Sequence, residues 1–141
     1  MATLAIVAVL GAFFLYKPQV RKMQEITFDL GKNIVETARE SGVPEFQTRD
    51  VAGLVSYSIA GIPKELPVRY IRPGYEIAWQ PVFGLRMYAD RAVDPGLHVA
   101  TVTLSLNQEM ASHEAAQAFV ERTIAQFAKG MWQRYFDPES E

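Results

Sequence analysis

Residues 97–136 read LHVATVTLSLNQEMASHEAAQAFVERTIAQFAKGMWQRYF, and the spacing of their apolar side chains changes midway. Between Ala100 and Leu106, apolar and hydroxyl-bearing residues alternate, which predicts a strand with one buried face. After Ser112 the apolar residues recur every three or four positions, which predicts a helix. This stripe comprises Ala116, Phe119, Val120, Ile124, Phe127, Met131 and Tyr135. A strand followed by an amphipathic helix indicates an α+β fold, with the C-terminal helix packed on a sheet through this stripe.

The ends of this helix also carry signals. Ser112 can cap the first turn, and the charge of Glu114 complements the helix dipole there. Asp137 and Pro138 are expected to end the helix, which leaves 137–141 as a frayed acidic end.

Three further segments upstream have strand-like alternation. They are 54–60, 75–79 and 82–90. Asp94, Pro95 and Gly96 match a turn that would join the last of these to the strand after Leu97. We therefore expect a three- to four-stranded antiparallel sheet, interrupted by loops at 43–50 and at the proline-rich residues 61–74.

The segment from Gln19 to Ser41 is expected to form an amphipathic helix. One stripe recurs at spacings of three and four, and it comprises Val20, Met23, Thr27, Leu30, Ile34 and Ala38. Pro18 fits the first turn, and Gly42 supplies a stop.

The N-terminal residues 1–17 are predicted to be a membrane anchor helix, ahead of a single domain at 18–141. Residues 2–16 carry no charge, and Lys17, Arg21 and Lys22 come directly after them. Fifteen residues span about 22 Å, which is short for a bilayer core of about 30 Å. A cleaved signal and a buried core helix are the alternatives. The anchor side chains are Leu4, Ile6, Val7, Val9, Leu10, Phe13, Phe14, Leu15 and Tyr16.

The side of the membrane on which the domain lies is open to two interpretations. The basic residues after the anchor favour the cytoplasm by the positive-inside rule. A bacterial chain with a signal-like N-terminal segment usually exports the domain attached to that segment. We expect a single-pass protein of the bacterial inner membrane with its domain in the periplasm.

The composition argues against several classes of partner and of catalytic activity. Fourteen basic and sixteen acidic residues give a net charge of −2, which argues against a nucleic-acid partner. The absence of cysteine excludes disulfides and thiolate chemistry. The two histidines, His98 and His113, belong to no metal-ligand pattern, and neither a G-x-S-x-G turn nor a phosphate-binding glycine loop occurs. No catalytic residue, metal or cofactor is therefore predicted, and a non-enzymatic role is favoured.

One cluster has the composition of a protein interface. Arginine and tyrosine are common interface anchors, and they flank the proline-rich excursion and the strand after it. The predicted partner-binding residues are Arg69, Tyr70, Arg72, Tyr75 and Arg86. Core packing of the aromatics with solvated arginines is the alternative interpretation. The sequence favours a membrane-tethered protein-binding or accessory module, of which an inhibitor or toxin-immunity protein would be one instance. A small envelope hydrolase and a structural assembly subunit remain as alternatives.

Overall fold

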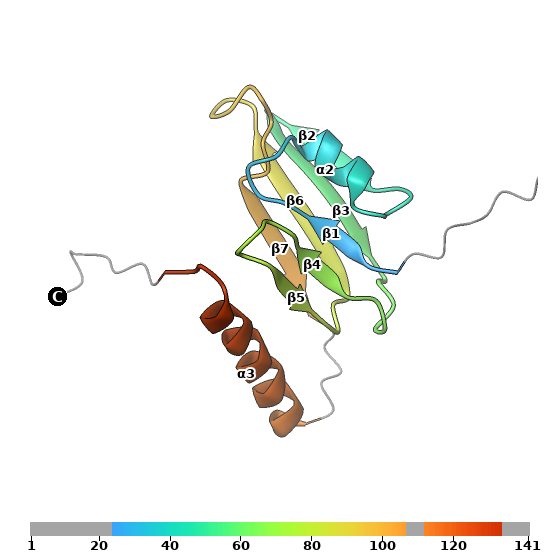
Figure 1. The fold of residues 1–141 in the computed structure, drawn as a ribbon. Helices are drawn as coiled ribbons and strands as arrows, with labels where there is room; N and C mark the ends of the chain where they lie inside the picture. Colours follow the sequence, from blue (N-terminus) through green and yellow to red (C-terminus); the bar gives the residue numbers. More distant parts are fainter. Residues whose placement is uncertain (1–23, 107–111, 134–141) are drawn as a thin grey trace, which may run out of the picture.

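The computed structural model describes residues 24–106 and 112–133, which form two helices and two sheets (Figure 1). The elements are β1 (Ile26–Phe28), α2 (Ile34–Glu40), β2 (Gln47–Val51), β3 (Leu54–Ala60), β4 (Val68–Tyr70), β5 (Ile77–Trp79), β6 (Gly84–Asp90), β7 (Thr101–Ser105) and α3 (His113–Lys129). The α+β class is confirmed. Among these residues, no helix is both long and apolar enough to cross a membrane. The predicted anchor, Tyr135 and the frayed end lie outside the described residues.

The larger sheet is antiparallel, with the strand order β2-β3-β6-β7. Its register places Val55, Leu85 and Met87 on one face, where all three are buried. The strands predicted at 54–60, 82–90 and after Leu97 are confirmed as β3, β6 and β7. Between the last two, the amide of Leu97 donates to the carbonyl of Asp94 at 2.9 Å, within the predicted turn.

The smaller sheet has the order β1-β4-β5, with β1 parallel to β4 and β4 antiparallel to β5. The prediction of a single sheet is therefore wrong, because β5 pairs with β4 rather than with β6. The expected loop at 61–74 contains β4, which Pro67 and Pro73 flank on either side. The expected loop at 43–50 contains most of β2, whose five residues are all exposed at the sheet edge.

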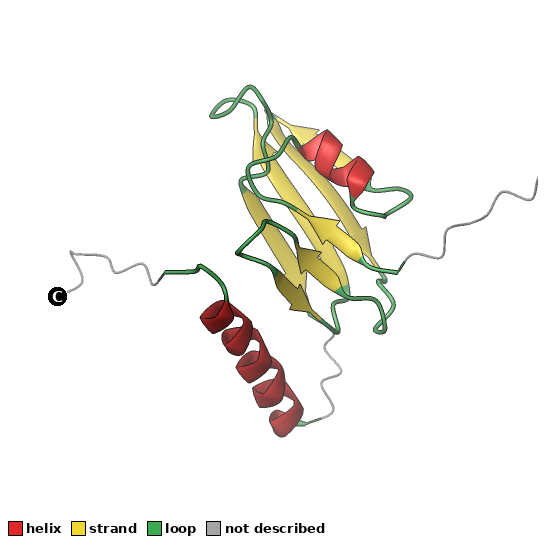
Figure 2. Ribbon diagram, in the orientation of Figure 1, coloured by secondary structure: helices red, strands yellow, loops and turns green. Residues whose placement is uncertain are grey.

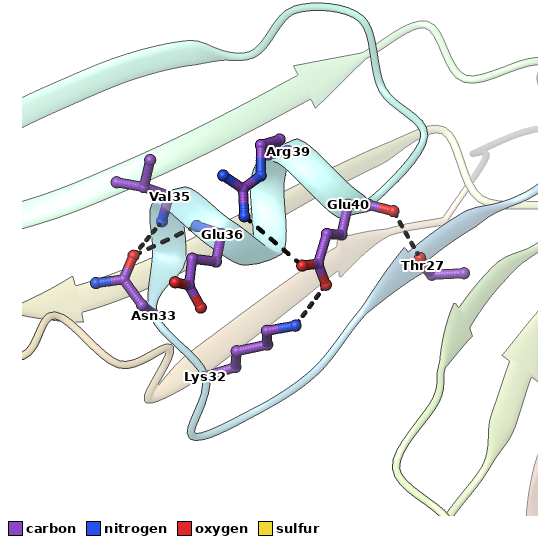
Figure 3. A network of polar contacts seen from close by, with 7 residues as sticks. All are labelled: Thr27, Lys32, Asn33, Val35, Glu36, Arg39 and Glu40. Carbon is purple, nitrogen blue, oxygen red and sulfur yellow. Dashed lines mark hydrogen bonds and ion pairs between the residues drawn. The ribbon is translucent and has the colours of Figure 1, made fainter.

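The predicted helix from Gln19 to Ser41 is wrong over 26–33. Residues 26–28 form β1, and Gly31 lies shortly after it with a φ of +73°, which a helix does not allow. The helix begins instead at Ile34, where the Oδ1 of Asn33 accepts hydrogen bonds from the amides of Val35 at 2.9 Å and Glu36 at 3.3 Å (Figure 3). Pairing with β4 and this cap together override the helical spacing of the apolar residues.

The core lies between the four-stranded sheet and a second layer made of α2 and the three-stranded sheet (Figure 2). Its fully buried side chains come from both layers and include Ile26, Ile34, Val68, Leu85 and Met87. The opposite face of the four-stranded sheet is left without a second layer from the described residues.

The C-terminal helix α3 is confirmed, and Ser112 caps it by accepting a hydrogen bond from the amide of Ala115 at 3.2 Å. The helix lies alongside β5 rather than over the four-stranded sheet (Figure 1). Of the predicted stripe, within the described residues Phe119 alone is buried. The prediction that the whole stripe packs on the sheet is therefore wrong.

Candidate functional site

Two of the predicted partner-binding residues, Arg69 and Arg72, form ion pairs within the chain. The Nη1 of Arg69 lies 3.1 Å from the Oε2 of Glu25, and the Nη2 of Arg72 lies 3.1 Å from the Oδ1 of Asp29. Arg72 also donates to the carbonyl of Leu30. Both arginines therefore tie β4 and the residues after it to the segment around β1.

The two predicted tyrosines pack against aromatic rings. Tyr70 is 4% exposed, with its ring centroid 5.6 Å from that of Phe28 and 5.9 Å from that of Trp132. Burial raises the pKa of the Tyr70 phenol. Tyr75 is half-buried and meets Trp132 edge-on at 5.2 Å. These rings hold the residues after α3 against the smaller sheet.

The fifth predicted residue, Arg86, lies elsewhere. It is exposed on β6, in the four-stranded sheet, where the register places it between Ser58 of β3 and Thr103 of β7. The structure thus gathers Arg69, Tyr70, Arg72 and Tyr75 around the smaller sheet, and it separates Arg86 from them by placing it in the other sheet.

Sequence reasoning missed an exposed apolar stripe along α3. Its exposed fractions are 52% for Val120, 60% for Ile124 and 38% for Phe127. Met131 is 61% exposed but lies beyond the C-cap Gly130, and its amide donates to the carbonyl of Gly74 at 2.7 Å. The helix meets β5 through a different face, on which Gln126 exchanges two hydrogen bonds of 2.7 Å with the backbone of Ala78. At 100° per residue, the centre of the stripe lies roughly a third of a turn from that face. The apolar spacing in the sequence predicts a helix face that avoids water, but it does not specify whether this chain or another buries that face.

A hollow borders this stripe near the C-terminal end of α3. It has a volume of about 260 Å³ and is lined by Ile124, Phe127, Ala128, Trp132 and Gln133. Phe127 meets Trp132 edge-on with centroids 5.1 Å apart, so one flank of the ring is covered. Contiguous exposed apolar side chains beside a hollow are typical of an interaction site.

Two polar clusters elsewhere have local partners. Lys32 pairs with Glu40 near the end of α2, and Arg39 lies 3.8 Å from the same carboxylate (Figure 3). The hydrogen bond from Lys32 lowers the pKa of Glu40, and it raises that of Lys32. The exposed ring of His98 meets the Oδ2 of Asp94 at 2.6 Å, and this contact lowers the pKa of Asp94. In the part of the chain that the structure describes, no three histidine or carboxylate side chains are placed to hold a metal.

Comparison of the chain with protein-family models, with curated proteins and with solved structures gives no match.

Proposed function

We propose that the chain is a protein-binding module, held at a bacterial envelope membrane by residues 1–17, that recognises its partner through the exposed apolar stripe of α3. The observation that carries this proposal is the exposure of Val120, Ile124 and Phe127 on one side of a helix that is anchored to the sheet by another side. An inhibitor or toxin-immunity protein would be one instance of such a module.

The spacing of the stripe supports this role. The three residues stand at i, i+4 and i+7, which is the pattern by which an amphipathic helix inserts its anchors into the groove of a partner. Full burial of one such side chain contributes about 1.5 to 3 kcal/mol. Partial exposure in the free chain leaves much of that free energy for binding, and Gln126 holds the helix in place beforehand.

Arg69 and Arg72 have a smaller part in the proposed contact than composition suggested. Each would have to exchange a carboxylate of its own chain for one of the partner. Such an exchange replaces one ion pair by another and therefore adds little affinity.

The test compares two lysine substitutions at neighbouring positions of α3. Ile124→Lys places a charge in the stripe, whereas Ala125→Lys places it on an exposed position outside both the stripe and the sheet-contacting face. Lysine is a good helix former, so both variants should keep the helix. Each of the three full-length chains is recovered from native membranes together with the proteins bound to it. Mass spectrometry then quantifies those bound proteins.

We expect the wild-type chain and Ala125→Lys to recover the same partner, and Ile124→Lys to lose it. Equal recovery by Ile124→Lys would show that α3 is not the contact. Equal loss in both variants would show that charge anywhere on the helix is responsible, and it would count against the stripe.

A further inference from the structure

One face of the four-stranded sheet is covered by no other element of the described residues, and it has a regular arrangement of polar side chains. Its register aligns one row across all four strands and a second row beside it. The first row is Gln47, Ser58, Arg86 and Thr103, and the second is Arg49, Ser56, Tyr88 and Thr101. These residues are exposed or half-buried, and hydroxyl groups predominate among them.

The charge of these two rows is positive. Each contains one arginine and no carboxylate, although the whole chain has a net charge of −2. Ion pairs among the described residues join Arg39, Arg69, Arg72 and Arg91 to carboxylates, but none of them includes Arg49 or Arg86. No carboxylate of the described residues therefore neutralises either guanidinium group.

A pocket of about 220 Å³ lies around Arg86. Its polar lining consists of Gln47, Ser58, Arg86, Tyr88, Thr103 and Ser105. The hollow arises because the adjacent row is Ala60, Gly84 and Ser105, whose side chains are small or absent. A Cβ at Gly84 would lie 3.1 Å from the carbonyl of Ile59, so a larger residue would crowd this floor. The hydroxyl of Tyr88 lies 3.4 Å from the Nη1 of Arg86 and helps to orient the guanidinium.

We propose that this pocket binds the carboxylate of an acidic side chain on a partner protein, with Arg86 as its charged donor and the surrounding hydroxyls as neutral donors. A guanidinium matches a carboxylate in charge and in its two-pronged geometry. A phosphate group carries nearly two charges, and only one guanidinium lines the pocket. The inference rests on the proposed protein-binding function, but it uses residues that α3 does not contribute.

The experiment titrates the isotope-labelled full chain, in neutral detergent, with acetylated tetraglutamate peptide and with the matching tetraglutamine peptide. We expect the acidic peptide to shift the NMR signals of the Arg86 side chain and of the central residues of β3 and β6. The tetraglutamine peptide should not. Arg86→Gln should weaken tetraglutamate binding by about tenfold or more, because hydrogen bonds between charged groups are lost. Arg122→Gln, which removes an exposed charge from α3, should leave it unchanged.

Three results would overturn the proposal. Equal weakening by Arg86→Gln and Arg122→Gln would mean diffuse electrostatic attraction. Inorganic phosphate that shifts the same signals more strongly than the peptide would assign the pocket to a free anion. Peptide binding that survives both Arg86→Gln and Thr103→Val would place the contact elsewhere. Ile124→Lys should not alter the titration, so failure of the α3 proposal and failure of the pocket are distinguishable.

Discussion

The two helices that the structure describes bury very different shares of their apolar residues. Three of the seven residues of α2 are buried, namely Ile34, Thr37 and Ala38. In α3, which is described over its full seventeen residues, Phe119 is the sole buried residue. The longer helix, with the more regular stripe, therefore contributes less to the core than the shorter one.

This difference arises from where each helix attaches. α2 begins at an Asn33 cap shortly after β1 and lies over the four-stranded sheet, so its apolar side chains meet β6. α3 attaches to the edge strand β5, where Gln126 bonds to the backbone of Ala78, and Phe119 is the residue of the helix that is buried. An apolar stripe thus predicts that one face of a helix is buried, but it does not specify whether the same chain or a partner buries that face.

The sharpest test of the comparison pairs Ile34→Ala with Ile124→Ala. Ile34 is 0% exposed, so its truncation should leave a cavity and lower the free energy of unfolding by about 2 to 5 kcal/mol. Ile124 is well exposed, and its truncation should change stability by less than about 0.5 kcal/mol. Chemical denaturation of the full chain measures both. Similar losses for the two variants would mean that α3 is packed as tightly as α2.

A second pair, Phe119→Ala and Phe127→Ala, compares two sides of α3 itself. Phe119 is 8% exposed, and its removal should cost about 3 kcal/mol. Phe127 keeps its contact with Trp132 but is partly exposed, so we expect about 1 to 2 kcal/mol. The apolar stripe in the sequence predicts a buried Phe127, whereas the side chain is 38% exposed. Denaturation midpoints that move further for Phe127→Ala than for Phe119→Ala would reverse the assignment of the two faces.

The attachment of α3 to the sheet can be weakened at Gln126. Its side-chain amide both donates to and accepts from the backbone of Ala78, as a neighbouring strand would. Gln126→Ala should therefore cost about 1 to 2 kcal/mol and speed hydrogen exchange at the amide of Ala78. Gln117→Ala is the control, because the Gln117 side chain donates to the exposed Glu121 within the same helix. Unchanged exchange at Ala78 would show that the helix is held by other contacts.

The smallest expected effect is a pH dependence of folding stability, which arises from Asp94 in the turn before β7. The pKa of Asp94 is lowered, mainly by the hydrogen bond from His98. A carboxylate with a depressed pKa in the folded state stabilises the fold above its ordinary pKa, and this contribution is lost as the pH falls through the folded value. NMR titration of Asp94 should give a midpoint below the ordinary one, and His98→Ala should raise it. A midpoint indifferent to His98→Ala would assign the shift to the backbone amides of Gly96 and His98 instead.

The features that sequence reasoning predicted well depend on neighbouring residues. Alternation over 54–60 and 82–90 identified β3 and β6, and Ser112 identified the start of α3. The cap at Asn33 was equally local, but the helical spacing around it concealed β1. At the candidate sites, Arg86 is exposed, as its alternation in the strand predicts, whereas burial of Tyr70 depends on Phe28 and Trp132, which are distant in the chain.

The sequence by itself determined the α+β class and the positions of most strands, because periodicity and capping act over a few residues. Only the tertiary structure decided that the strands divide into two sheets, that Arg69 pairs with Glu25 across 44 residues of sequence, and that the stripe of α3 remains exposed. These outcomes depend on which surfaces the chain path brings together. A stripe of apolar residues favours burial against any complementary surface, and the path of the chain places α2, but not the stripe of α3, against such a surface among the described residues.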